Sequence, residues 1–412
     1  MFVAITNEPR PYAWGSRTLI PEFFGRAPSG SPEAELWLGA HPLCPSRILD
    51  PSRSGGHEHL DSWIAAEPEL TLGADRSSDE LPFLMKLLAA NEPLSIQVHP
   101  NAAQAKEGFE AERALGIPVD SPVRSYKDPR HKPEIALALE DPFEALVGFR
   151  PMEATRQLIG VLIRRAGHRP DAQRTLTGLA ARLRGNAEEA LRCVVAEFLD
   201  HSAAARLLEA VGIAVGASGD TGGFTGEIAT LAEIAAARPG DPGLLVALLL
   251  NHVTLERDQA VYLPPGNVHA HLRGLAVEVM AASDNVVRAG LTGKHLDVVE
   301  LQRITHFTET LDPIHTAEHP AEGLTVHRPE EPDFQLVVVE ANAGEGTLAA
   351  LHGPGIVLAL EGAPQLLGRV EMSSLSRGDA VFVTPDETAL RVAGSGRIAL
   401  ASCRRATAQT RL

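Results

Sequence analysis

The sequence predicts a mainly β protein with an α-helical insertion. Short apolar runs broken by Pro and Gly dominate residues 1–150 and 334–412, whereas apolar residues in 152–211 recur at helical spacing. In the last segment, turn-forming residues recur roughly every ten positions, which favours a sandwich or jelly roll. We therefore expect two β units and a helical region between them.

The first β region is expected to consist of strands and loops. Residues 36–39, 135–139 and 145–149 are typical of its short apolar runs. Because such runs are bounded by turn-forming residues, each is predicted to be a buried strand.

The middle of the chain has a different pattern. Leu158 and Leu162 begin a series of apolar residues at helical spacing. A glycine-rich stretch at 216–226 lacks the G-K-[ST] ending of a phosphate-binding loop, so we interpret it as a linker. Asp241 and Pro242 are typical of a helix start, and this helix should run to about residue 250.

Two distant segments resemble each other. Residues 258–266 and 378–386 share the pattern of a strand followed by a turn. The first copy continues to His269 and His271, whereas the second copy continues without histidine. Two related β barrels, one of which binds metal, would explain this pattern, and chance similarity is the alternative.

Composition excludes several classes of protein. The chain has 412 residues, 44% of them hydrophobic, and a net charge of −16, which argues against nonspecific binding to nucleic acid or to an anionic membrane. Cys44, Cys193 and Cys403 are far apart, so we expect neither disulfides nor a thiolate metal site. This suits a reducing cytoplasm. We expect no signal peptide, since no basic stretch with an apolar core is visible at the N-terminus.

Residues 94–100 are the most informative stretch. Polar and apolar residues alternate there, so Gln97 and His99 should point to the same side of a strand, and Pro100 should keep His99 extended. An amide oxygen and an imidazole on one face are half of a metal site.

The remaining metal ligands are expected further along the chain. Glu134 follows a proline in residues 131–134, and His269 and His271 lie two positions apart. Since both histidines would face the same side of a strand, their spacing does not decide which one binds metal. Structural histidines are the alternative interpretation.

Glu278 lies inside an apolar run, at 275–280. Burial there should raise its pKa unless a cation compensates, and Arg288 and Lys294 are the nearby candidates. This predicts an acid/base carboxylate beside an anion-binding pair, and a structural ion pair is the alternative.

Lys86 and Lys132 are further candidate site residues. Lys86 lies in the apolar run 82–88, where a snorkelling surface lysine is the alternative interpretation. Lys132 lies two residues before Glu134 and would share its direction in an extended chain.

Taken together, these stretches resemble the class I mannose-6-phosphate isomerases, also called phosphomannose isomerases. The matching blocks, in the family's order, are residues 11–16, 34–42, 81–100, 131–134 and 264–294.

The resemblance implies a cupin-type architecture with two jelly-roll-like units. It divides the chain into a catalytic cupin domain at 1–150 and 256–320, a helical insertion at 151–255, and a C-terminal cupin-like domain at 321–412 that binds no metal. It also implies one Zn²⁺ per chain, held by the residues at the family's ligand positions: Gln97, His99, Glu134 and His269. At position 271 the family usually has an aromatic residue, so the role of His271 is open.

The implied reaction interconverts mannose 6-phosphate and fructose 6-phosphate by proton transfer through a cis-enediol. Glu278 is the expected base, and a base from the zinc shell is the alternative. Arg288 falls on the family's active-site arginine and should stabilise the enediolate or hold the phosphate. The remaining expected substrate contacts are Lys294, Lys86, Lys132 and Ser95.

Two other functions compete with this one. His99, His269 and Glu134 could form the 2-His-1-carboxylate site of a cupin Fe(II) oxygenase, although Gln97 and the several cations argue against it. A non-enzymatic sugar-binding cupin would need the metal site alone. As an enzyme, the chain is expected to be a cytoplasmic monomer or weak homo-oligomer with a phosphosugar substrate.

Overall fold

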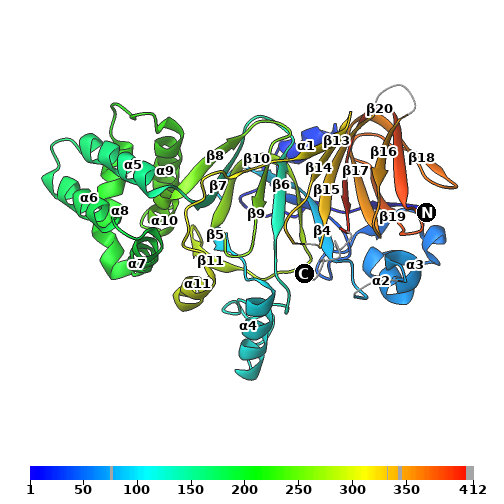
Figure 1. Cartoon of the computed structure of the whole chain (residues 1–412), viewed down its shortest axis with the longest axis horizontal. Helices are drawn as coiled ribbons and strands as arrows, with labels where there is room; N and C mark the ends of the chain where they lie inside the picture. Colours follow the sequence, from blue (N-terminus) through cyan, green and yellow to red (C-terminus); the bar gives the residue numbers. More distant parts are fainter. Residues whose placement is uncertain (75–77, 332, 342–345, 405–412) are drawn as a thin grey trace, which may run out of the picture.

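The computed structural model describes residues 1–404 except 75–77, 332 and 342–345. It contains two ten-stranded antiparallel sheets and a separate group of helices. In Figure 1 the helices, the first sheet and the second sheet lie in a row from left to right. The predicted fold class, mainly β with a helical insertion, is confirmed.

The central sheet is built around one long strand, β10 (His269–Ala281). The first half of β10 pairs with β5 and β7, and its second half pairs with β4 and β6. This strand therefore connects the two predicted histidines to Glu278 along one backbone. The other strands are β2 (Glu35–Leu38), β4 (Phe83–Ala90), β5 (Ile96–Val98), β6 (Glu134–Ala138), β7 (Phe143–Phe149), β8 (Leu250–Leu255), β9 (Ala260–Leu263), β11 (Val287–Gly290) and β12 (Ile314–His315).

The C-terminal sheet also includes two N-terminal strands. β1 (Phe2–Thr6) pairs with β19 (Ala380–Val383), and β3 (Arg47–Ile48) pairs with β1. The start of the chain thus closes the edge of a sheet made by its end. The other strands are β13 (Glu318–Ala321), β14 (Leu324–His327), β15 (Gln335–Ala341), β16 (Thr347–Ala350), β17 (Gly355–Leu367), β18 (Met372–Ser374) and β20 (Ala389–Ser402).

The repeat expected at 258–266 and 378–386 is visible in the strands. β9 is followed by a turn and the long β10, and β19 is followed by a turn and the long β20. His269 opens β10, whereas Ala389 opens β20.

The alternation of side chains along β10 separates a core from a site. Val277 and Val279 join the apolar cluster between the two sheets, together with Phe382 of the C-terminal sheet. Glu278 lies between these valines in sequence, so its side chain points to the opposite face of the strand. The same periodicity that buries the inter-sheet core thus places a carboxylate inside the central sheet.

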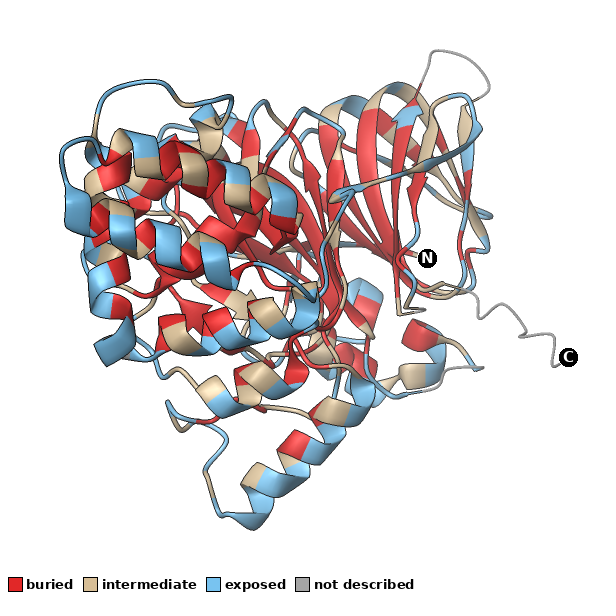
Figure 2. Ribbon diagram, turned by 60° about the vertical axis from the view of Figure 1, so that its left-hand side comes forward, coloured by how far each residue is buried: buried red, intermediate tan, exposed pale blue. Residues whose placement is uncertain are grey.

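Six helices form the insertion, and their apolar faces make one core. Its residues include Leu158, Leu176 and Phe198, and it continues onto Ile96 and Ala270 of the central sheet. Figure 2 shows these buried stripes alternating with exposed ones along the helices. The helices are α5 (Met152–Arg165), α6 (Pro170–Arg182), α7 (Ala187–Leu199), α8 (His201–Gly216), α9 (Thr225–Ala237) and α10 (Gly243–Leu249).

The expectation that residues 1–150 contain only strands and loops is wrong. In α4, which projects from the body of the molecule in Figure 1, a capping box explains the helix start. The Asn101 side chain accepts from the Gln104 N–H, and the Gln104 side chain accepts from the Asn101 N–H. The helices of this region are α1 (Leu19–Phe23), the 3₁₀ helix Pro51–Ser54, α2 (Leu60–Ala66), α3 (Pro68–Leu72) and α4 (Ala102–Ala114). A further helix, α11 (Val298–Ile304), lies between β11 and β12 of the central sheet in the chain.

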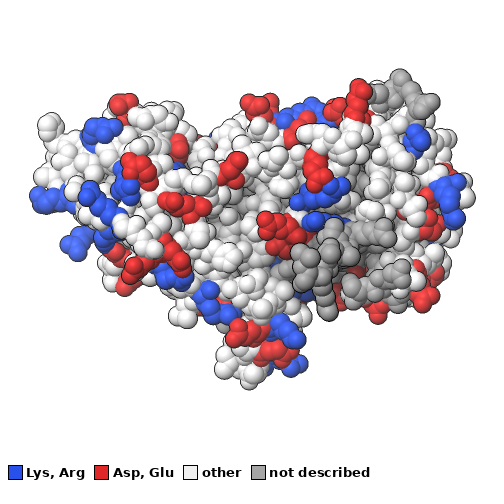
Figure 3. Space-filling view, viewed as in Figure 1, with Lys and Arg blue, Asp and Glu red and all other residues white. Residues whose placement is uncertain are grey.

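On the face shown in Figure 3, acidic and basic side chains are interspersed over the helical insertion and over α4. Among the described residues, no helix has the length and apolar character needed to cross a bilayer.

Candidate active site

Two histidines and a glutamate converge inside the central sheet. His99 Nε2 lies 3.5 Å from Glu134 Oε1, and His269 Nε2 lies 3.3 Å from Glu134 Oε2. All three residues are buried, and their ligand atoms lie within 4.8 Å of one another. Neither Nε2 atom has a hydrogen-bond partner among the described residues. Buried nitrogens without partners that face a carboxylate are what a divalent metal site requires.

Backbone carbonyls orient both imidazoles. The Asn285 carbonyl lies 2.7 Å from His99 Nδ1, and the Asn267 carbonyl lies 3.0 Å from His269 Nδ1. A carbonyl can only accept, so Nδ1 carries the proton in each ring and Nε2 keeps its lone pair free. Burial, aided by the charge of Lys132, lowers the pKa of His99 to about 4, which keeps this ring neutral at neutral pH.

Gln97 lies beside this group through strand register. It stands opposite His269 of β10 on one side and opposite Arg288 of β11 on the other. Residues directly opposite each other in antiparallel strands project to the same face, so these three side chains form a row. An amide oxygen here would complete a set of nitrogen and oxygen donors.

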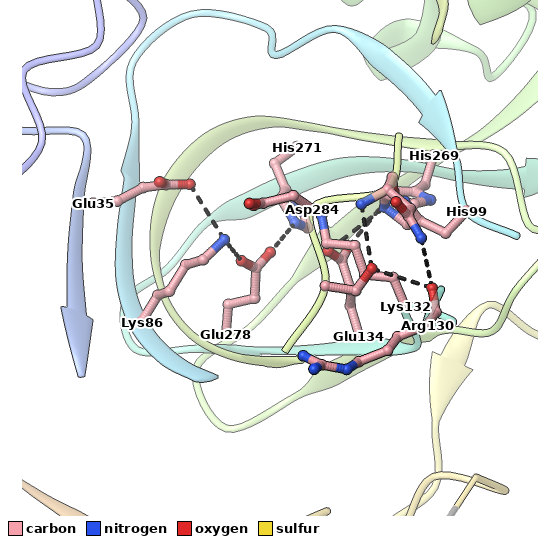
Figure 4. A network of polar contacts seen from close by, with 12 residues as sticks. Glu35, Lys86, His99, Arg130, Lys132, Glu134, His269, His271, Glu278 and Asp284 are labelled. Carbon is pink, nitrogen blue, oxygen red and sulfur yellow. Dashed lines mark hydrogen bonds and ion pairs between the residues drawn. The ribbon is translucent and has the colours of Figure 1, made fainter. Parts of the chain in front are cut away.

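A second polar group lies next to the first on the same face (Figure 4). Lys86 stands opposite Glu278, and its Nζ lies 2.8 Å from Glu278 Oε2 and 3.6 Å from Glu35 Oε1. Trp37 Nε1 donates to Glu35 Oε2 at 2.8 Å, and Lys86 Nζ lies 5.4 Å from the centre of the Trp37 ring. The lysine is therefore a buried cation held by two carboxylates, and the interpretation as a snorkelling surface residue is wrong.

The expected raised pKa of Glu278 is also wrong. Burial alone would raise it, but the Lys86 ammonium and a hydrogen bond from His271 more than offset this and lower the pKa to about 2. Arg288 and Lys294 were the expected compensating cations, whereas the compensating cation is Lys86. Glu278 is therefore fully ionised at neutral pH.

His271 belongs to the Glu278 group. Its Nε2 lies 3.0 Å from Glu278 Oε1, and its ring packs edge-on against Phe143. The two histidines of β10 thus have different neighbours: His269 lies with His99 and Glu134, and His271 lies between Glu134 and Glu278.

Lys132 is paired with the carboxylate of the first group. Its Nζ lies 3.0 Å from Glu134 Oε1, and the lysine is buried. Burial would raise the pKa of Glu134, but the charge of Lys132 lowers it well below its usual range. Glu134 is thus a carboxylate, the form that binds metal.

A cavity of about 370 Å³ opens onto both groups. Arg288, Lys294 and Ser95 line it together with Gln97, and so do both carboxylates, Glu134 and Glu278, and both buried lysines, Lys86 and Lys132. Burial lowers the pKa of Arg288, and burial together with the charge of Arg288 lowers the pKa of Lys294. The structure thus brings the sequence-predicted residues to one cavity, with His99 and His269 buried against Glu134.

Several contributing residues were not expected from the sequence. Asn285 orients His99 and also holds the loop before β6, because its Nδ2 donates to the carbonyls of Asp128 and Arg130 at 2.7 Å. Glu35 and Arg238 line the cavity as well. The sequence Ser283-Asp284-Asn285 is typical of a turn, and this is the available signal for Asn285. For Arg238 no local pattern gave a signal.

The comparisons with known proteins agree with this geometry. The model of the family "Phosphomannose isomerase type I, catalytic domain" matches residues 2–152. The mannose-6-phosphate isomerase of Escherichia coli (strain K12) is 35% identical over 408 residues, covering 96% of this chain and 98% of that protein. The mannose-6-phosphate isomerase of Homo sapiens is 31% identical over 414 residues, covering 92% of each chain.

Solved structures extend the likeness to the whole fold. A crystal structure of mannose 6-phosphate isomerase in its zinc-bound holo form superposes with a TM-score of 0.85 at 33% identity, covering 98% of this chain and 100% of that one. A second structure, bound with zinc and yttrium, has a TM-score of 0.85 at 32% identity and the same coverage.

Proposed function

This chain belongs to the type I phosphomannose isomerase family, and from this we propose how its own residues isomerise mannose 6-phosphate. The chain is an aldose–ketose isomerase that uses zinc. The roles are assigned on one observation: Glu134, Glu278 and several cations, among them Arg288 and Lys294, line the same cavity.

We propose that Gln97, His99, Glu134 and His269 hold one Zn²⁺. The unpartnered Nε2 atoms, the ionised Glu134 and the in-row position of Gln97 support this set. When bound, the ion supplies a Lewis acid that polarises the sugar's oxygen atoms.

We propose that Glu278 moves the proton between C2 and C1 of the sugar. It lines the cavity, is ionised, and is fixed by Lys86 on Oε2 and His271 on Oε1. A base with so low a pKa is weak, so the acidity of the C2 proton must come from charge stabilisation around the sugar oxygens. The carboxylate removes the proton from C2, the hydroxyl proton of O2 passes to O1 at the cis-enediol stage, and the carboxylate returns its proton to C1 as O2 becomes the ketone oxygen.

Charge pairing divides the substrate contacts. Lys86 and Lys132 are already matched by Glu278 and Glu134, so we propose that they contact sugar hydroxyls. Arg288 and Lys294 have no carboxylate within 4.0 Å among the described residues, and with the Ser95 hydroxyl they are proposed to serve the enediolate and the phosphate.

We propose three domains: a catalytic domain formed by 1–150 and 256–320, a helical insertion at 151–255, and a C-terminal domain at 321–412. Strands β1 and β3 come from the first range but pair within the C-terminal sheet. A cytoplasmic monomer or weak homo-oligomer without a nucleic-acid partner is proposed, and the three free cysteines, Cys44, Cys193 and Cys403, support a reducing compartment.

A coupled isomerase assay on the purified protein tests the function. Mannose 6-phosphate should be converted to fructose 6-phosphate, a chelator should abolish conversion, and added zinc should restore it. An active enzyme that a chelator cannot inhibit would refute the role of the metal.

A further inference from the structure

One arginine of the helical insertion reaches the active-site cavity. Arg238 directly follows α9, and its side chain lines the same cavity as Arg288 and Lys294. Among the lining residues, it is the one that the insertion contributes. The remaining lining residues come from the N-terminal part of the chain and from residues 271–294.

The position of Arg238 is fixed by a tight junction between the insertion and the cation-bearing loop. Asp241 Oδ1 accepts from the Gly243 N–H at 2.8 Å and from the Leu291 N–H at 2.9 Å. The Arg238 carbonyl accepts from the Asp241 N–H at 3.1 Å, which ties the arginine to the same turn.

The two backbones also touch at this junction. A Cβ atom on Gly290 would lie 2.3 Å from Gly243 Cα, so a side chain at position 290 would separate them. Gly290 lies between Arg288 and Lys294 in sequence, and Arg238 is therefore held at a set place relative to both.

Charge pairing distinguishes this wall of the cavity. The lining carboxylates face their own lysines: Glu278 and Glu35 face Lys86, and Glu134 faces Lys132. Among the described residues, no carboxylate lies within 4.0 Å of the side-chain nitrogens of the three remaining cations, Arg238, Arg288 and Lys294.

Several other arginines of the insertion are paired with carboxylates. Arg156 pairs with Glu153, Arg182 with Glu197, and Arg192 with Glu188. Positive groups that line one cavity repel one another, as Arg288 does Lys294, and a ligand with two negative charges would relieve this repulsion.

We propose that Arg238 binds the phosphate group of the substrate together with Arg288 and Lys294, and so makes the enzyme select a phosphorylated sugar. This inference rests on the proposed function. It gives the helical insertion a role in the site: the insertion supplies the third cation of a phosphate subsite, and the Asp241 junction sets its distance from the other two.

Steady-state kinetics of Arg238→Ala and Arg238→Lys test the proposal. For mannose 6-phosphate, Arg238→Ala should raise KM by about tenfold or more with little change in kcat, because a charge-assisted contact remote from the reacting carbons is lost. For unphosphorylated mannose, kcat/KM should not change. Inorganic phosphate, used as a competitive inhibitor, should bind more weakly by a similar factor, and Arg238→Lys should recover part of the affinity.

Arg184→Ala is the matched control. Arg184 is exposed in the same insertion, and its removal changes the net charge equally without touching the cavity lining. The control should keep the wild-type KM. Equal KM increases in both variants, or a folded Arg238→Ala with wild-type KM and wild-type phosphate inhibition, would overturn the proposal.

The outcomes also separate this inference from the proposed function. A wild-type protein without activity on mannose 6-phosphate would refute the function. Thermal stabilisation of that protein by inorganic phosphate, lost in Arg238→Ala, would still support the anion subsite, and stabilisation kept in the variant would refute it.

Discussion

Lys86 and Glu278 stand directly opposite each other on β4 and β10, and their side chains form a buried ion pair of 2.8 Å. The pair keeps Glu278 ionised at neutral pH, because the ammonium group of Lys86 lowers the pKa of Glu278 to about 2 although the carboxylate is buried. It also fixes the carboxylate in the cavity, with His271 on its other oxygen.

Lys86→Met should destabilise the protein and reverse the direction in which Glu278 makes its stability depend on pH. It leaves Glu278 and Glu35 buried without their cation, at a cost of about 3–5 kcal/mol at neutral pH. In the wild type, the lowered pKa of Glu278 gives stability that is present above about pH 4.5 and lost as the pH falls towards 2.

In the variant the pKa of Glu278 should lie above its unfolded value, so stability should increase as the pH falls from 7 to 5. Urea unfolding at these two values measures the change. A variant with the wild-type midpoint at both would show that the ion pair contributes nothing to folding.

The metal site should hold one equivalent of zinc per chain. His99→Ala removes one of two oriented imidazoles and should reduce bound zinc to near zero in elemental analysis. His327→Phe serves as a control in the C-terminal sheet and should keep the zinc. A second equivalent, coordinated within residues 321–404, would refute the expectation that this sheet binds no metal.

Arg288 should act on the enediolate in the transition state as well as on the phosphate. Arg288→Ala should lower kcat about a hundredfold, equivalent to roughly 3 kcal/mol, because the lost contact is to the developing enediolate. Its position in a row with Gln97 and His269 places Arg288 at the proposed metal. Arg238, in contrast, follows helix α9 of the insertion. If kcat is unchanged and only KM rises, Arg288 serves the phosphate alone.

His327 should make the C-terminal sheet sensitive to acid. It is buried at the end of β14, neither ring nitrogen has a partner among the described residues, and burial, with the charges of His315 and His319, lowers its pKa to about 4. In the native state the imidazole of His327 stays neutral, whereas in the unfolded chain it binds a proton below its unperturbed pKa of about 6.5.

The free energy of unfolding should therefore be unaffected by His327 above about pH 6.5 and should fall by up to about 3 kcal/mol towards pH 4. Since His327→Phe removes this proton, the slope of unfolding free energy against pH should be smaller in the variant than in the wild type. Equal slopes would show that His327 does not contribute to acid sensitivity.

Local sequence patterns predicted much of the fold and of the candidate site. The alternation around Gln97 and the position of Glu278 inside an apolar run placed both on strands whose polar face carries the site, and helical spacing identified the insertion. The resemblance to the family then indicated which histidine of the pair at 269 and 271 belongs with His99.

Contacts between distant segments could not be predicted in this way. Lys86 and Glu278 are 192 residues apart, and only the pairing of β4 with β10 brings them together. For this reason the compensating cation and the direction of the pKa shift of Glu278 were predicted wrongly. Arg238 was missed for the same reason, since it reaches the cavity through the junction of Asp241 with Leu291. The start of α4 was missed although Asn101 and Gln104 gave a local signal.

The central claim is that Glu278 transfers a proton between C2 and C1, and isomerisation in deuterium oxide tests it most directly. Because the carboxylate exchanges its proton with solvent during some turnovers, deuterium should appear at C1 of fructose 6-phosphate by NMR. Folded, zinc-loaded Glu278→Gln keeps the side-chain shape without the base and should be nearly inactive. Wild-type product that carries the C2 hydrogen at C1 with no solvent deuterium, formed at a similar rate by Glu278→Gln, would contradict the account.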